Sequence, residues 1–254
     1  LDLFHDLIEA NGDRLASEIQ LLAKKLYKAR GDSITLVSLA RAGTPVGVLL
    51  ARALKAKHTD DVKHYSISIV RDRGIDKAAL QHIAESGRPA DSIIFVDGWT
   101  AKGVINRELK QAVADWNLNS RYQISDELCV ISDLSGHADY IATADDYAIP
   151  SGVLNSTVSG LLSRTLILDG VPGFHQCICY SHLASADLST WFVDRVSCRF
   201  GRVAAAIDNV SPGWKIKRLN DVASFIVKVI LDCSIRDINR IKPGVSEATR
   251  VMLR

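Results

Sequence analysis

The chain has 254 residues, of which 47% are hydrophobic and 24% are charged, and its formal net charge is +2. This composition is ordinary for a globular protein, and it gives no overall basic field that would favour nucleic acid or membrane partners, although local basic sites stay possible. No stretch reaches the roughly 18 uncharged apolar residues that a membrane span needs.

Five cysteines are an odd number, and the chain opens with acidic residues where the basic part of a signal peptide would stand. Free thiols in a reducing compartment are therefore expected. These features predict a cytoplasmic protein with no membrane partner, for which nucleic acid is not an expected partner.

Apolar periodicity predicts an alternation of helices and strands in the first half of the chain. A long amphipathic helix covers residues 1–30, with a possible break at Asn11-Gly12-Asp13. The elements that follow are strand 34–39, helix 46–56, strand 64–70, helix 77–85, strand 92–96, helix 102–116 and strand 128–132. Such βαβ units favour an α/β fold with a doubly wound parallel sheet and flanking helices, in which ligands bind at the carboxyl ends of the strands.

The second half is less regular. It predicts a strand at 174–180, a helix at 186–196, an apolar helix or strand at 222–231 and a last helix after the turn at 241–244. A composition rich in Gly, Ser and Pro near 200–213 suggests a boundary. We expect residues 1–200 to form the α/β domain, and 201–254 to form a small C-terminal subdomain or extension.

The segment from Ser92 to Ile105 is the most specific motif. An apolar strand ends at Asp97, a loop of small and polar residues follows, and a helix begins. Amide groups at a helix N-terminus favour a phosphate, and a carboxylate just before them can accept hydrogen bonds from two ribose hydroxyls. An ordinary βα turn with a capping acid has the same pattern.

Two further loops carry arginine at strand ends. Arg41-Ala42-Gly43-Thr44 lies between strand 34–39 and its helix, where the arginine fork suits a phosphate and glycine lets amides turn inward. Arg71-Asp72-Arg73-Gly74 follows strand 64–70, and it is placed to offset the charge of a leaving group. Solvated charged turns are the alternative for both.

These motifs together resemble the type I phosphoribosyltransferases. The resemblance implies that Asp97 holds the ribose of phosphoribosyl pyrophosphate and helps to orient Mg²⁺ indirectly. By the same resemblance, a 5′-phosphate loop comprises Thr100, Ala101, Lys102, Gly103 and Val104, a pyrophosphate loop comprises Arg41, Ala42, Gly43 and Thr44, and Arg71 and Arg73 close over the leaving group. Three residues depart from the family pattern. Gly98 stands where many members carry a second acid, and Lys102 and Ile105 replace other residues that are usual in the family.

A wider resemblance, to the phosphoribosyltransferase-like domain of the StiP family, covers nearly the whole chain. It is carried by residues 64–69, 95–100, 154–160 and 242–244. That family is associated with bacterial stress and tellurite resistance and is often labelled a cysteine protease. Val153 stands where relatives are expected to carry a cysteine.

The function expected from these resemblances is transfer of the phosphoribosyl group to a base or nucleoside-like acceptor, with release of pyrophosphate. Candidate acceptor residues are Trp99, Asp133, Asn155, Ser156 and Thr157, although Asn155 or Ser156 would equally cap a helix. A non-catalytic sensor of a nucleotide or phosphosugar, and a cysteine hydrolase, are the alternatives. A homodimer is possible, since dimers are common in the resembled enzymes. The Cys and His residues within 175–182 have the wrong spacing for zinc.

Overall fold

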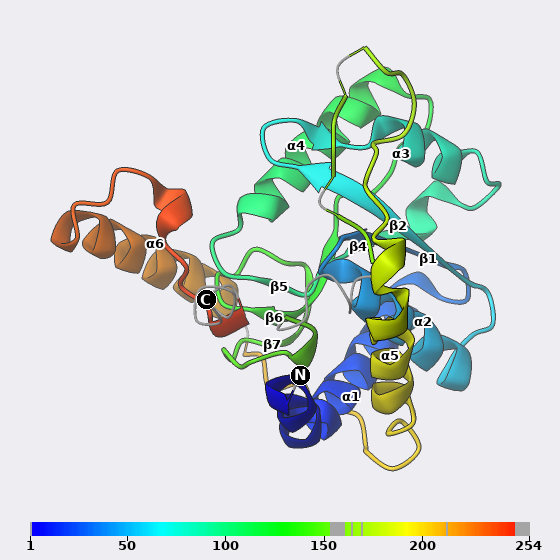
Figure 1. Cartoon of the computed structure of the whole chain (residues 1–254), viewed down its shortest axis with the longest axis horizontal. Helices are drawn as coiled ribbons and strands as arrows, with labels where there is room; N and C mark the ends of the chain where they lie inside the picture. The colour runs from blue at the N-terminus through cyan, green and yellow to red at the C-terminus, as the bar shows by residue number, and fades with distance from the viewer. Residues whose placement is uncertain (1, 153–160, 164, 169, 212, 247–254) are drawn as a thin grey trace.

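The computed structural model describes residues 2–152, 161–163, 165–168, 170–211 and 213–246 (Figure 1). A mostly parallel sheet lies at its centre. The parallel strands are β1 (Ile34–Ala40), β2 (Val62–Val70), β4 (Ile93–Val96), β5 (Trp99–Thr100), β6 (Leu128–Asp133) and β7 (Tyr140–Thr143). The short β3 (Gly74–Ile75) pairs antiparallel with the end of β2 and forms a hairpin with it.

Helices cover both faces of the sheet, as the alternating pattern predicted. On one face lie α1 (Asp2–Arg30), α2 (Gly43–Lys57) and α5 (Ser189–Ser197), packed on a buried cluster that includes Leu36 and Ile94. On the other face lie α3 (Lys77–Ala84) and α4 (Val104–Asn119), packed on a cluster that includes Val37 and Phe95. Neighbouring strand residues point to opposite faces, so one apolar run supplies both cores. The doubly wound α/β fold is confirmed.

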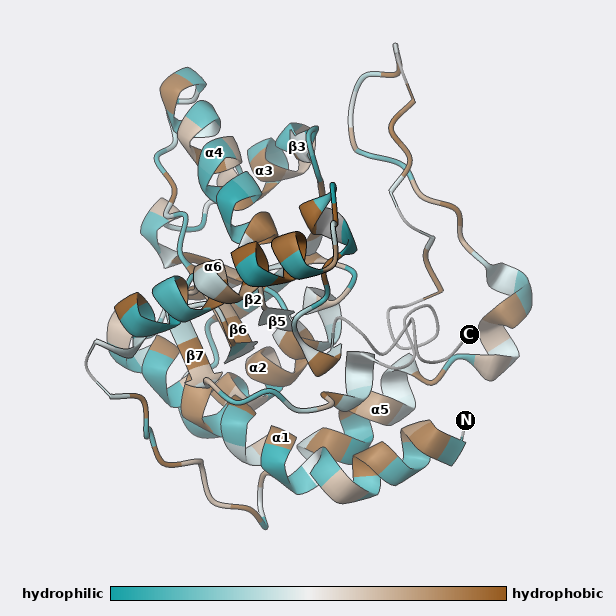
Figure 2. Ribbon diagram, turned by 90° about the vertical axis from the view of Figure 1, so that its left-hand side faces the viewer, coloured by the Kyte–Doolittle hydropathy of each residue, from teal (hydrophilic) through white to brown (hydrophobic). Residues whose placement is uncertain are grey.

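The remaining helix, α6 (Trp214–Asp232), extends away from the sheet (Figure 1). Ile226 is its buried residue, whereas Ile216 and Leu231 are largely exposed. Figure 2 shows brown apolar and teal polar residues alternating along α1, α5 and α6. Among the described residues, no helix is both long enough and apolar enough to cross a membrane. Short 3-10 turns complete the chain: η1 (Ala90–Ser92), η2 (Pro150–Gly152), η4 (Ser181–Ala186) and η5 (Ile238–Arg240).

Several local predictions were wrong. Helix α1 runs unbroken through Gly12, and the guanidinium of Arg199 packs over that position, where an added Cβ would lie 3.0 Å from its carbon. Residues 174–180 do not form a strand of the sheet, and two isolated bridges join Gln176 to Leu166 and Cys179 to Leu162. The strand β7 was not foreseen.

Candidate functional site

Two of the three loops that the sequence singled out, the Arg41 loop and the loop that begins at Asp97, lie side by side at the carboxyl ends of β1 and β4. The peptide bond between Ala40 and Arg41 is cis, and α2 begins two residues later at Gly43. A Cβ on Gly43 would lie 2.2 Å from the carbonyl oxygen of Val96 and 3.1 Å from the Cα of Asp97. Only glycine permits this approach, which places the Arg41 loop directly against Asp97.

Hydroxyl groups hold the first loop in place. Ser38 Oγ donates a hydrogen bond of 2.9 Å to the carbonyl of Gly43 and lies 2.8 Å from Nε2 of His64. Burial lowers the pKa of His64 to about 4, so its ring is neutral near pH 7 and donates to the Ser38 hydroxyl. One residue further on, Thr44 Oγ1 lies 2.6 Å from Oγ of Ser66 on β2. These neutral groups therefore position the loop that carries Arg41.

Asp97 lies between the end of β4 and the start of β5, and its side chain is largely buried. Burial raises the pKa of its carboxyl to about 7, and a hydrogen bond of 2.7 Å from the Gly98 amide acts in the opposite direction. A carboxyl with this pKa is poised between its two protonation states at neutral pH. Hydroxyl or cationic partners would favour the charged state.

The second loop is more deeply buried than the sequence suggested. Thr100, Ala101 and Lys102 are each at most 7% exposed, and none of them lines the large cavity described below. Gly103 has a φ of +67°, and the ring of His137 packs so closely that an added Cβ would lie 2.4 Å from it. Val104 is the first residue of α4.

Asp133 differs from its expected role. It is fully buried, and its carboxylate accepts hydrogen bonds from three backbone amides, those of Ser135, Gly136 and Ala138, and from the Ser135 hydroxyl. The carboxylate shapes the turn after β6, and Asp133 is not among the residues that line the cavity described below. An acid at the end of a strand can stabilise a local turn as well as bind a ligand, and the sequence pattern alone does not distinguish the two roles.

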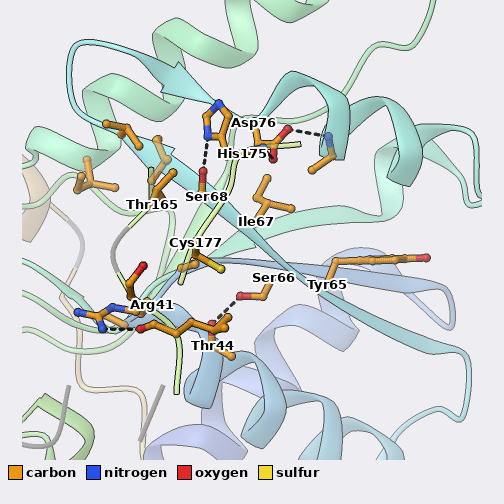
Figure 3. A pocket seen from close by; sticks show the side chains of 18 of the residues that line it. Arg41, Thr44, Tyr65, Ser66, Ile67, Ser68, Asp76, Thr165, His175 and Cys177 are labelled. Atoms are coloured by element: carbon orange, nitrogen blue, oxygen red, sulfur yellow. Dashed lines mark hydrogen bonds between the residues drawn. The ribbon is translucent and has the colours of Figure 1, made fainter. Parts of the chain in front are cut away.

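A cavity of about 1160 Å³ opens beside the first loop (Figure 3). Three cationic side chains border it: Arg41, Arg71 and Lys242. Trp99, a predicted acceptor residue, also lines the cavity, whereas Asp97 and Arg73 do not. Asn155, Ser156 and Thr157 lie outside the described residues. The charges at its border suit an anionic ligand.

Described residues within 162–177 form one wall of the cavity, and side-chain contacts hold this wall to the sheet. The backbone amide of His175 donates to the Asp76 carboxylate at 2.8 Å, and its ring Nδ1 bonds the hydroxyl of Ser68 (Figure 3). Arg41 donates to the carbonyl of Leu162 at 2.8 Å. Asp76 also caps α3 through the amide of Ala79 at 2.9 Å.

Sequence reasoning missed Asp76 and His175 as cavity residues. It also considered Cys177 for zinc alone, whereas Cys177 is an exposed thiol on the cavity wall. An acid directly before a helix is a recognisable cap, but its second partner lies 99 residues away in the sequence. No local pattern could have joined the two.

The side chains of the site offer few ligands for a metal ion. Within the part of the chain that the structure describes, no group of three His, Cys, Asp or Glu side chains could hold a metal ion. Mg²⁺ that arrives with substrate phosphates needs only one or two carboxylates. Asp97, between the two loops, fits that indirect role.

Comparisons with solved structures give distant likenesses. A hypoxanthine-guanine phosphoribosyltransferase from Bacillus anthracis matches with a TM-score of 0.37 and 16% identity, over 54% of this chain and 80% of that one. The hypoxanthine phosphoribosyltransferase of Trypanosoma cruzi, in complex with the product IMP, matches with a TM-score of 0.39 and 16% identity, over 54% and 74% of the two chains.

Sequence comparisons are closer. The model of the PELOTA RNA binding domain matches residues 221–254. A protein of Acinetobacter baylyi named cysteine protease StiP is 39% identical over 267 residues, which span all of this chain and 68% of the relative. The family model described as tellurite-like stress resistance cysteine protease StiP matches residues 1–197. The chain therefore belongs to the StiP family.

Proposed function

We propose that this site binds phosphoribosyl pyrophosphate with Mg²⁺ and transfers the phosphoribosyl group to a base or nucleoside-like acceptor. The observation that supports the proposal is the contact between the Arg41–Thr44 loop and Asp97, beside a cavity bordered by cationic side chains. A phosphorylated pentose carries anionic groups for the cations and a diol for the carboxylate.

In this proposal the chain positions the ligand and stabilises charge. The bond from the ribose C1 to the pyrophosphate oxygen breaks, and its electron pair leaves with pyrophosphate. A lone pair of the acceptor forms the new bond to C1, and the proton that the acceptor loses passes to solvent water. Arg41 and Arg71 offset the charge that grows on the leaving group. Asp97 accepts hydrogen bonds from the ribose hydroxyls and fixes the ring. Mg²⁺ bound with the pyrophosphate would supply further positive charge there, and Asp97 would help to orient it.

The test is pyrophosphate release over a panel of nucleobases. Asp97→Ala is expected to abolish turnover while circular dichroism shows an intact fold. Arg71 and Arg73 form a matched pair, because both lie in one turn and Arg71 alone of the two lines the cavity. Arg71→Ala should lower kcat/KM much more than Arg73→Ala. Full activity in Asp97→Ala would show that Asp97 is wrongly assigned.

A non-catalytic sensor is the closest alternative of the same site. Gly98 stands where a second acid would strengthen the ribose and magnesium contacts, and without a ligand the Asp97 carboxyl is only partly ionised near pH 7. Calorimetry with phosphoribosyl pyrophosphate and Mg²⁺ separates the two functions. Binding without pyrophosphate release supports the sensor.

A cysteine hydrolase is the second candidate, and the exposed thiol of Cys177 on the cavity wall favours it. His175, two residues earlier, lines the same cavity. The Cys129 thiol is an unsuitable nucleophile, because it is fully buried and burial raises its pKa. Cys177→Ser should abolish peptide hydrolysis, whereas Cys179→Ser, also an exposed thiol, serves as the control. Hydrolysis that survives Cys177→Ser removes this candidate.

A further inference from the structure

Lys102 occupies an unusual position for a residue of a phosphate loop. Its side chain is buried, and its ammonium group donates hydrogen bonds of 2.6 and 3.1 Å to the backbone carbonyls of Ile241 and Ile238. These acceptors lie more than 130 residues away in the sequence. A buried lysine requires acceptors, and the end of the chain supplies them.

The segment that supplies these carbonyls, residues 238–246, is called the C-terminal strap below. Its far end is fixed by exposed Asp146, whose carboxylate accepts the Val245 amide at 2.9 and 3.0 Å. Ser246 Oγ donates to the carbonyl of Tyr147 at 3.1 Å. Gly244 packs against Ala101, whose Cβ would lie 3.4 Å from a Cβ added to that glycine. The strap therefore covers the loop that contains Lys102.

The strap also reaches the cavity, because Lys242 and Ser246 are among its lining residues. One short segment thus contacts both the buried loop and the cavity wall. Movement of the strap would expose the ammonium group of Lys102 and the amides of the loop, and it would enlarge the cavity on that side.

We propose that the strap and a ligand phosphate compete for Lys102, so that the strap is a built-in competitor which keeps the loop closed until a phosphorylated ligand displaces it. The inference rests on the proposed function, because it takes the ligand to be a sugar phosphate. A phosphate is charged and offers several strong acceptors, whereas the strap offers neutral carbonyls. The ligand can shift the equilibrium only by its preference for the open state.

The adjacent acids Asp145 and Asp146 provide a matched pair for the test. Both are exposed, but the Asp145 carboxylate pairs with Arg14 at 3.0 Å, and among the described residues it makes no hydrogen bond or ion pair with the strap. Asp146→Asn weakens the strap, and Asp145→Asn is the control. Hydrogen exchange of residues 238–246 should be about tenfold faster in Asp146→Asn than in the control, the change expected on weakening one charged hydrogen bond. Phosphoribosyl pyrophosphate with Mg²⁺ should bind severalfold more tightly to Asp146→Asn.

Lys102→Met removes the hydrogen bonds between Lys102 and the strap and keeps an apolar side chain of similar length. Without ligand, exchange of the strap should accelerate, and calorimetry should show a loss of affinity for phosphoribosyl pyrophosphate of tenfold or more, as for a lost charged hydrogen bond. Ligand binding to the wild type should likewise accelerate exchange of the strap.

The strap and the proposed function fail in different ways. If phosphoribosyl pyrophosphate binds but strap exchange stays unchanged, or if Asp146→Asn and Asp145→Asn bind it equally well, the competition is refuted. If no variant binds phosphoribosyl pyrophosphate, ribose 5-phosphate or AMP, the proposed function fails and the competition fails with it. Faster strap exchange in Lys102→Met without ligand would still show that Lys102 holds the strap in place, and unchanged exchange would refute that role of Lys102.

Discussion

Replacing Asp97 by asparagine should change how stability depends on pH. The pKa of Asp97 is raised by burial from an ordinary 3.8 to about 7, so the folded protein resists ionisation of this carboxyl. Below pH 3.8 the group is protonated in both folded and unfolded chains and costs nothing. Between pH 3.8 and about 7 it ionises mainly in the unfolded chain, so the free energy of unfolding falls as the pH rises.

The size of the effect follows from the pKa difference. A difference of about 3 in pKa corresponds to about 4 kcal/mol, lost in full once the pH exceeds the folded pKa. Part of the side chain reaches solvent, which makes this value the upper limit. An asparagine side chain at this position keeps an oxygen that can accept the Gly98 amide but never ionises. Asp97→Asn should therefore be more stable than the wild type by about 2–4 kcal/mol at pH 8.

Urea unfolding of both proteins between pH 4 and pH 8.5 measures this difference. Other titrating groups cancel when the two unfolding free energies are subtracted at each pH. We expect the difference to grow by about 1.4 kcal/mol per pH unit and to level off near pH 7. A difference that does not vary with pH would show that Asp97 titrates as a solvated carboxyl, and the burial argument would be wrong.

Three further predictions concern the same region. Because ribose or cation contacts favour ionised Asp97, binding of phosphoribosyl pyrophosphate at pH 6 should release up to one proton, and calorimetry in buffers of different ionisation enthalpy should show the release disappear above pH 8. Asp133→Ala leaves three backbone amides without their acceptor and should lower the free energy of unfolding by about 3–5 kcal/mol in urea titrations, while an effect under 1 kcal/mol would contradict its structural role. Gly47→Ala puts a Cβ 2.1 Å from Ser38 Oγ and 2.4 Å from His64 Nε2, so thermal unfolding should show a loss of about 1–3 kcal/mol, and a neutral effect would mean that the His64 ring is free to move.

The α/β architecture could be predicted from sequence because its signals are local. The run Ile34–Ala40 is apolar, and the next helix follows within a few residues, so pattern and connection length agree. The approach of the Arg41 loop to Asp97 could also be anticipated, since both follow parallel strands that end at one edge.

The burial of the second loop could not be predicted, because its cause is remote. Nothing near Lys102 in the sequence indicates that its acceptors are the carbonyls of Ile238 and Ile241. The contact between Asp76 and His175 is of the same kind. The chemistry of a side chain limits which groups it can bind, whereas the packing of segments that are distant in the sequence determines which of those groups lies next to it.

Net charge was also a coarse guide. The value of +2 describes the whole chain, whereas Lys217, Arg218 and Lys228 are exposed on the single helix α6. Residues 221–254 match the RNA binding domain model, and that match includes the end of this helix. The expectation that nucleic acid is not a partner stays a prediction, which titration of labelled single-stranded RNA at two salt concentrations would test.

The glycine at position 43 has a consequence for anyone who alters this protein. Its hydrogen-only side chain is the spacer that sets how far apart the arginine loop and the carboxylate stand. Any larger residue would collide with the backbone of Val96 and Asp97 and would push the two loops of the site apart. A survey of tolerated substitutions should therefore find this position as restrictive as a residue that takes part in chemistry, whereas residues 174–177, which line the cavity, should accept more changes.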